Sequence, residues 1–239
     1  MRRCCQYSIV LFALFMSGLA HGQEPQTIRA KFRILSVNDE ISSLSIVGAS
    51  ETQEVMIPEL RRSDIYRYEG PQVLSFIKTD QIVEGEPLPA PVMQVRGVSK
   101  HKNALILVFR IESSVGTRFQ SIVMSDDIDG FPGGTSRFVN ISSYPLLLLF
   151  EEGEEPQKLA SGGIFSHAFK TENQNVHIRI ASYADGEVHK GLDDRIFPKP
   201  IHRDIYFIFE ENDGENGRVK MRRLREHRNA AIHLYRSDG

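Results

Sequence analysis

Alternation of apolar and polar residues with a period of two is the feature that most constrains the fold of this chain. From Ile28 to Ile34, apolar residues alternate with Arg29, Lys31 and Arg33, which is the pattern of a β-strand with one buried face. Short runs rich in Val, Ile and Phe recur after it, separated by Gly, Pro and acidic turns. Because no stretch of twelve or more residues has a comparable helical period, the pattern predicts an all-β fold.

The stretch Asn103–Ile111 differs from the other predicted strands because it is almost continuously apolar. That composition favours a central strand buried on both faces. The stretch Glu226–Tyr235 is the one helix candidate after the N-terminal apolar segment. Strands are predicted at residues 28–35, 43–48, 54–57, 72–79, 91–97, 103–111, 117–125, 136–142, 145–150, 176–183, 187–189, 205–210 and 218–224.

Short strands at this spacing, without helical windows between them, are typical of β-sandwiches. Gly and Pro concentrate between Gly130 and Gly134, so the sequence places a module boundary there and predicts an exposed connection. We therefore expect two small, immunoglobulin-like β-sandwich modules in tandem, although the strand at 117–125 fits either one. The predicted divisions are a leader at 1–22, modules at 23–125 and 126–225, and a C-terminal tail at 226–239.

The N-terminal segment Met1–Gly22 has the order of a cleaved signal peptide. Arg2 and Arg3 precede a short apolar core, and Ala20-His21-Gly22 places small residues before Gln23. The core is shorter than the roughly 20 residues that a membrane-spanning helix needs. The sequence therefore predicts a secreted or periplasmic protein without a transmembrane segment.

Cysteine usage and charge narrow the setting further. Cys4 and Cys5 belong to the predicted leader, so the mature chain would have no disulfide and no thiolate ligand, which favours a bacterial origin. A net charge of −2 makes no case for nucleic-acid binding. The one sequon, Asn140-Ile141-Ser142, would matter only in a glycosylating pathway.

No arrangement of residues along the sequence points to catalysis. The serines lack a Gly-x-Ser-x-Gly context, and the histidines lack His-x-His and His-Glu-x-x-His spacings. The sequence therefore predicts no catalytic residue, no metal site and no cofactor. The alternative is an exported hydrolase or lyase acting on polysaccharide. It would require one pocket to bring together Asp126, Asp129, His167, His177, Arg179 and His202.

The loop Asp126–Gly130 is the nearest approach to a cation site. Its carboxylates followed by a glycine are similar to a calcium-binding loop. The match fails in detail, because Ser125 stands at the first ligand position and Ser136 at the last, where a bidentate Glu is required. We interpret the loop as an acidic turn between strands.

Tyr66 and Tyr68 lie two residues apart and therefore share one face of an extended strand. Exposed rings at these positions could hold a sugar or a peptide. The chain has no Trp, which weakens a carbohydrate-binding interpretation. Packing at the edge of the core, near Gly70 and Pro71, is the preferred prediction.

A basic strip late in the chain is the candidate ligand-binding site. Arg218, Lys220 and Arg222 alternate with Val219 and Met221, so the three cations share the solvent face of a strand. Protection of an exposed sheet edge explains them structurally, as does pairing with the acidic residues that precede them. The functional interpretation is contact with an anionic envelope polymer or a lipid head group.

Two segments of the chain resemble a known group of proteins. The first is Ser63–Pro71 with Leu74 and Phe76, and the second is Phe131–Asn140 with Ser142 and Pro145. In this order after a signal peptide, they resemble uncharacterised secreted proteins of verrucomicrobial-type environmental bacteria. That group has no assigned activity. The resemblance therefore implies export and a double β-module layout, and it carries over no site residue.

The sequence thus predicts an exported, soluble, non-enzymatic β-sandwich protein with a binding or scaffolding role at the bacterial cell envelope. The expected partner is an anionic envelope polymer or another envelope protein. A protein partner would join through an exposed strand edge.

Overall fold

The computed structural model describes residues 27–113, 116–150, 155–169, 175–184, 186–211 and 217–228. Within these ranges the protein consists of strands with two short 3-10 helices, so the predicted all-β fold is confirmed. The predicted leader, Met1–Gly22, lies outside the described residues. None of the helices in the described part of the chain has the length and apolar character needed to cross a membrane.

The first half of the chain forms two four-stranded sheets, A and B. Its elements are β1 (Thr27–Ser36), β2 (Ile41–Val47), β3 (Thr52–Ile57), β4 (Tyr66–Pro71), β5 (Leu74–Lys78), η1 (Thr79–Gln81), β6 (Met93–Val95), η2 (Val98–Lys100), β7 (Ala104–Ser113) and β8 (Gly116–Ser125). The strand order is β4-β1-β7-β8 in sheet A and β3-β2-β5-β6 in sheet B. Apart from the parallel pair β1–β7, neighbouring strands are antiparallel.

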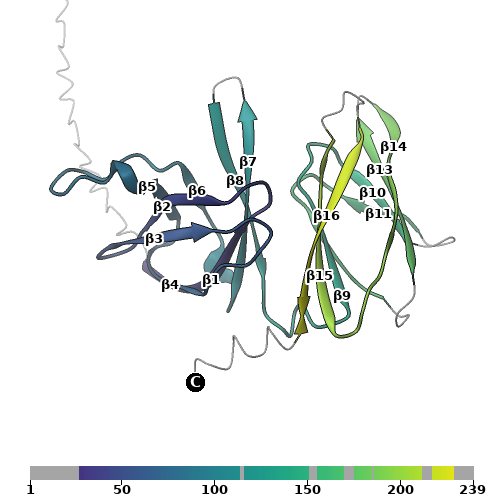
Figure 1. Ribbon diagram of the computed structural model, residues 1–239, viewed down its shortest axis with the longest axis horizontal. Coiled ribbons are helices and arrows are strands. Elements are labelled where there is room, and N and C mark those ends of the chain that lie inside the picture. Colours follow the sequence, from purple (N-terminus) through teal and green to yellow (C-terminus); the bar gives the residue numbers. More distant parts are fainter. Residues whose placement is uncertain are drawn as a thin grey trace, which may run out of the picture.

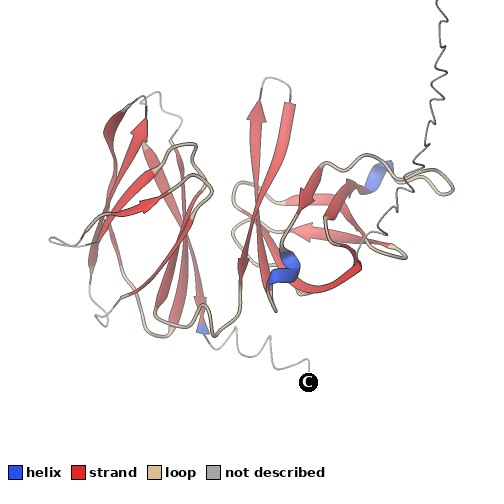
Figure 2. Ribbon diagram, turned by 180° about the vertical axis from the view of Figure 1, so that it is seen from behind, coloured by secondary structure: helices blue, strands red, loops and turns tan. Residues whose placement is uncertain are grey.

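The second half forms sheets C and D. Its strands are β9 (Thr135–Asn140), β10 (Leu146–Phe150), β11 (Gln157–Leu159), β12 (Ile164–Ala168), β13 (Val176–Ala184), β14 (Glu187–Ile196), β15 (His202–Glu210) and β16 (Val219–His227). The order is β12-β9-β15-β16 in sheet C and β11-β10-β13-β14 in sheet D. Here β9 and β15 are the parallel pair. The two halves appear as separate sandwich-like modules in Figures 1 and 2.

The two modules have the same topology. When β9–β16 are counted from one, sheets C and D repeat the strand orders of sheets A and B. The parallel ladders also match, because β1–β7 begins with Phe32 opposite Ala104 and β9–β15 begins with Ser136 opposite Asp204. This register assigns each position of one module an equivalent in the other, for example Arg137 for Arg33. The chain is therefore a structural tandem repeat.

Alternating residues of the strands fill three hydrophobic cores. One core lies between sheets A and B and a second between sheets C and D, as two sandwiches require. The third core joins the modules, because the outer faces of sheets A and C pack on each other through side chains such as Leu35, Leu107, Val139 and Phe207. The four sheets are thus stacked in the order B, A, C, D. Strands β7 and β15 face each other across the space between the modules in Figure 1.

The third core accounts for the apolar strand noted in the sequence. All residues from Ala104 to Phe109 are buried, which confirms that this part of the predicted stretch is covered on both faces, whereas Arg110 and Ile111 are exposed. Ala104, Ile106 and Val108 belong to the first core, whereas Leu105 and Leu107 belong to the inter-module core.

Two expectations at the module ends need correction. The connection between β8 and β9 is only partly exposed, because Gly130 and Pro132 are exposed as predicted whereas Asp126 and Phe131 are buried. The helix candidate Glu226–Tyr235 begins with Glu226 and His227, which belong to strand β16. Its residues 229–235 lie outside the described part of the chain.

Candidate anion-binding site

A cluster of ionised side chains lies buried at one end of the inter-module core. Asp126, whose side chain is 1% exposed, accepts two hydrogen bonds from Arg62, at 3.2 Å from Nε and 3.1 Å from Nη2. Arg203, which is fully buried, places Nη2 3.2 Å from the same carboxylate. Arg33 lies 4.0 Å away. One carboxylate of the β8–β9 connection thus receives guanidinium groups from both modules.

Glu226, near the end of β16, binds the same three arginines from the other side. Its carboxylate forms an ion pair with Arg203 and lies 3.3 Å from Arg62 and 3.8 Å from Arg33. Paired carboxylates are what allow buried guanidinium groups to remain charged. The cluster therefore joins the two modules by charge where the apolar contacts end.

A fourth guanidinium belongs to Arg137 of β9. It stacks on the fully buried ring of Phe131, 4.1 Å from the ring centroid, and donates a hydrogen bond to the carbonyl of Gly130 at 3.0 Å and another to that of Ser125. Burial lowers the pKa of Arg137 to about 10, and Asp126 opposes that change. The stacking on Arg137 holds the ring of Phe131 in place between the modules, and this fixes the β8–β9 connection.

The internal repeat makes this cluster pseudo-symmetric. By the strand registers, Arg33 of β1 is equivalent to Arg137 of β9, and Asp126 is equivalent to Glu226. Each module thus contributes one arginine and one acid at equivalent positions. With Arg62 and Arg203 added, four guanidinium groups gather around Asp126 and Glu226, and Asp127 acts electrostatically on Arg137 as a third acid.

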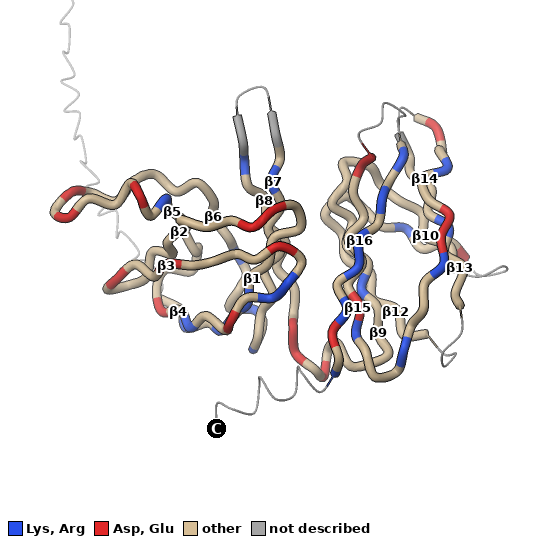
Figure 3. Tube along the Cα trace, viewed as in Figure 1, with Lys and Arg blue, Asp and Glu red and all other residues tan. Residues whose placement is uncertain are grey.

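An open groove lies on the outer face of β1, beside the part of the strand that precedes Arg33. The groove has a volume of about 680 Å³ and is lined by β1, β4 and the loop around η2. Its lining holds one carboxylate, that of Glu69, and five cationic side chains: Arg29, Lys31, Arg67, Lys100 and Lys102. Blue segments mark this basic stretch of β1 and β4 in Figure 3.

The charges in the groove come from both walls. On the sheet, Lys31 stands directly opposite Arg67 in the β1–β4 ladder, whereas Arg29 is paired with Glu69 at 3.0 Å. On the loop, Lys100 and Lys102 have exposed side chains. Among the described residues, no carboxylate lies within ion-pair distance of these two lysines. We call this site the basic groove.

The second module lacks the basic groove at the equivalent positions. The strand registers match Lys31 and Arg67 with Thr135 and Ala168. The same offsets, continued into the flanking residues, match Arg29, Lys100 and Lys102 with Gly133, Pro200 and His202. None of these five is Lys or Arg. Because the same fold forms without the five cations, folding of a module does not require them.

The basic strip predicted from the sequence has a different setting. Val219 is buried and Met221 packs on the second core, so the predicted alternation is confirmed, and β16 is an edge strand of sheet C. Lys220 lies 2.5 Å from Glu211, and Arg222 lies 3.2 Å from Glu59 of the first module. Two of the three cations are therefore neutralised, one by the hairpin acid and one across the interface.

Arg218, the remaining cation of the strip, precedes β16 and is exposed. It engages in an interaction of its own.

The residues named for a polysaccharide-acting enzyme are not brought together. Asp126 lies in the buried cluster and Asp129 on the turn that follows. His167 stacks on Phe150 in the second module, and His202 lies against His227.

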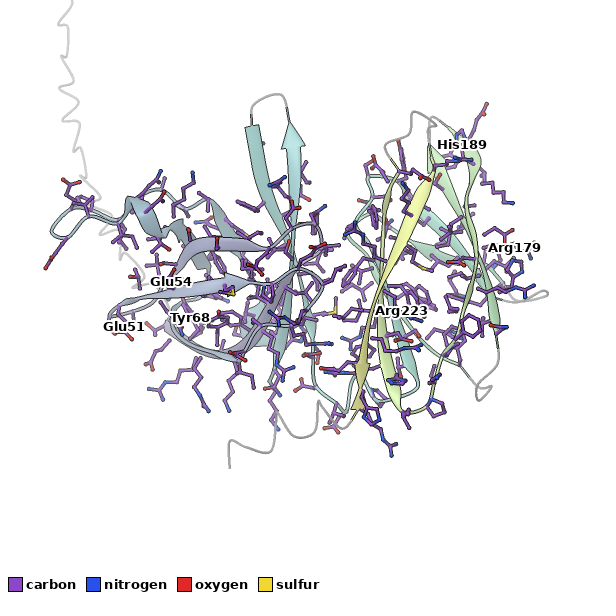
Figure 4. The ribbon with its side chains drawn as sticks, viewed as in Figure 1. Glu51, Glu54, Tyr68, Arg179, His189 and Arg223 are labelled. Atoms are coloured by element: carbon purple, nitrogen blue, oxygen red, sulfur yellow. The ribbon has the colours of Figure 1, made fainter. Side chains whose placement is uncertain are left out.

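On the exposed face of sheet D, His177 pairs with Asp193, and Arg179 lies two residues away. Figure 4 shows Arg179 on the side of the second module that faces away from the first. Within the described part of the chain, no group of three or more acids, histidines or cysteines is arranged to hold a metal.

The loop Asp126–Gly130 acts as a structural turn. The carboxylate of Asp126 is occupied by arginines, and that of Asp127 accepts hydrogen bonds from Asn103 at 2.8 Å and from Ser125 at 2.9 Å. A divalent cation there would face several guanidinium groups, which disfavours calcium binding.

The tyrosine pair behaves as the preferred sequence interpretation expects. Tyr66 and Tyr68 both pack on the first core. The hydroxyl of Tyr68 donates to the carbonyl of Pro71 at 2.8 Å, and burial raises its pKa. These rings are therefore not a platform for a ligand.

Sequence reasoning missed the basic groove, although part of its signal was visible. The alternation of Arg29, Lys31 and Arg33 marked the strand but was interpreted as an ordinary solvent face. The loop lysines, Lys100 and Lys102, join that row only because β7 runs parallel to β1. Their distance in sequence hid the site.

Comparison with known proteins adds no functional assignment. The sequence matches no protein-family model, and no curated protein is significantly similar to it. The fold and the site define an all-β protein of two repeated sandwich modules with an open basic groove on the first.

Proposed function

We propose that this protein is an exported, soluble, non-enzymatic binding or scaffolding protein of the bacterial cell envelope. Its signal-peptide-like N-terminus and its resemblance to secreted bacterial proteins support the location. The groove supports the role, because five cations gather around one carboxylate in an open depression. Such a surface attracts anionic partners.

The difference between the repeated modules is the observation that carries this proposal. The first module has Arg or Lys where the second has Gly133, Thr135, Ala168, Pro200 and His202. Both modules keep the apolar and ionic positions that hold them together. The basic residues therefore serve something other than folding, and binding of an anionic partner accounts for them.

The inter-module contacts support a scaffolding element in the same role. The third core and the buried cluster join the modules directly, so the pair is expected to move as one body. Apolar interfaces of this kind limit relative motion of domains. A rigid pair presents the groove in a fixed orientation relative to the second module.

Co-sedimentation with envelope material tests this function. The full-length chain is expressed in a bacterial host, and the exported product is expected to begin at Gln23. That product is mixed with purified envelope fractions at low and high ionic strength. We expect it to sediment with the envelopes at low ionic strength and to be released by salt. Retention of Met1 on the product, or a protein that stays in the supernatant at low ionic strength, would contradict the proposal.

A further inference from the structure

The cations of the first module form a row that is longer than one pocket. Arg29, Lys31 and Arg33 face the same side of β1, and together they span about 13 Å at the usual rise of a strand. At the Arg33 end lies a second depression of about 270 Å³, whose lining combines arginines with the carboxylates of Asp64 and Glu226. The row of cations therefore ends in the neutralised cluster at the module junction, and its unneutralised part lies in the open groove.

The open part of this row offers separate charges instead of one convergent set of donors. Arg29, Arg67, Lys100 and Lys102 are exposed, and Lys31 is half-buried. A small anion is usually held by several donors that meet at one buried point. Spaced, solvated cations instead match a ligand that repeats its negative charge along a chain.

The residues that line the groove also indicate which kind of polyanion it fits. Proteins that bind single-stranded nucleic acid combine basic grooves with exposed aromatic rings for base stacking. In the basic groove the ring of Tyr68 is turned into the first core, and the remaining ring is the imidazole of His101. A concave groove also fits a strand better than it fits the planar surface of a bilayer.

We infer that the basic groove binds a strand of an anionic polysaccharide whose sugars bear carboxylate or sulfate groups. The strand lies along β1, with its acidic groups between the sheet cations and the loop lysines. This inference rests on the proposed function and names its ligand class. Binding is electrostatic and therefore weakens as salt screens the charges.

Charge reversal on the loop wall tests the inference. Lys100→Glu with Lys102→Glu reverses two exposed cations of the groove, and Lys158→Glu with Lys199→Glu makes the same change in net charge on exposed positions of the second module. Binding of the exported protein to fluorescein-labelled heparin and polygalacturonate oligosaccharides is followed by fluorescence anisotropy. We expect the groove variant to bind about tenfold more weakly or worse, since exposed charge pairs contribute modestly and two are inverted. The matched control should bind like the unmodified protein.

Three further arms complete the test. The neutral pair Lys100→Gln and Lys102→Gln should lose part of the affinity, which keeps the test usable if the reversed pair folds poorly. The heparin and polygalacturonate arms distinguish sulfate from carboxylate recognition, and binding to either supports the inference. Equal losses in the groove and control variants would overturn it, as would tighter binding to an oligothymidylate or to phosphatidylglycerol vesicles than to both polysaccharides.

The outcome separates this inference from the proposed function. If the protein sediments with envelopes but binds neither polysaccharide, the ligand class is wrong and the envelope role stands. If it binds polysaccharide oligomers but does not sediment with envelopes, the groove is correctly assigned and the location is wrong.

Discussion

Removing the charge on Asp126 is the most direct test of how much the inter-module cluster contributes to stability. Asp126→Asn keeps the shape of the side chain but leaves Arg33, Arg62 and Arg203 with Glu226 as the acid that pairs with them. Breaking a buried ion pair by removing one partner usually costs about 3–5 kcal/mol, because the remaining charge stays desolvated. We expect a loss in this range.

An exposed ion pair in the same module provides the matched control. Glu69→Gln breaks the bond to Arg29, whose side chain is 83% exposed, and solvent screening leaves such exposed pairs with little effect on stability. Equilibrium urea unfolding, followed by circular dichroism, measures both variants. With a urea dependence of about 2–3 kcal/mol per molar, Asp126→Asn should lower the midpoint by about 1–2.5 M.

The comparison of the two midpoints decides the argument. Because the modules share the third core, we expect the unmodified protein to unfold in one transition. If Asp126→Asn lowers the midpoint no more than Glu69→Gln does, the cluster does not hold the modules together and our reasoning about the interface is refuted.

Three smaller predictions follow from single side chains. Asn140→Ala should lower the free energy of unfolding by about 2–4 kcal/mol, because the buried amide nitrogen donates toward three carbonyls and the amide oxygen accepts from Ser142. Thermal or urea unfolding measures this loss, and a loss smaller than that of Glu69→Gln would contradict it. Phe131→Ala should cost about 3–5 kcal/mol and open residues 126–134 to cutting by the broadly specific proteinase K, whereas the unmodified connection should resist. Early cutting there without the substitution would contradict the anchored loop. The hydrogen bond from His177 lowers the pKa of Asp193, so this carboxylate stabilises the fold above its ordinary pKa and loses that contribution as pH falls through the lowered value. His177→Ala should raise the pKa of Asp193 in a carbon-13 NMR titration, and an unchanged value would show that the bond is not formed in solution.

Much of the fold could be predicted from local pattern. The alternation after Ile28 and the apolar run Asn103–Ile111 identified β1 and β7 because side-chain period and burial are properties of single strands. The short strands β11 (Gln157–Leu159) and β12 (Ile164–Ala168) were missed. Runs of three and five residues contain too few positions to establish a period.

The repeat of topology could not be predicted in the same way. Equivalent positions such as Leu105 and Ile205, or Asp126 and Glu226, share burial and charge but not identity. Their equivalence becomes visible only through strand register. The similarity between the modules is therefore one of geometry.

The candidate site was even less accessible from sequence. The buried cluster collects its side chains from segments as far apart as Arg33 and Glu226, and only the packing of sheet A on sheet C brings them together. A lone arginine on a strand, such as Arg33 or Arg137, has the same local pattern as one that faces solvent. The sequence pointed to the strip at Arg222, which the structure instead places in contact with Glu59.

A distance measurement between the modules tests the central claim most directly, namely that the chain is one rigid body presenting the basic groove. Glu54 on β3 and Arg179 on β13 are exposed on the outer sheets of the two modules (Figure 4). Glu54→Cys with Arg179→Cys gives two spin-label sites, since the native cysteines lie in the predicted leader. Three sheet spacings of about 10 Å separate the backbones of the two outer sheets by roughly 30 Å, and the labels lie farther apart because both side chains point outward. Double electron–electron resonance should give a single narrow distribution beyond roughly 30 Å, and a broad or multiple distribution would contradict the account.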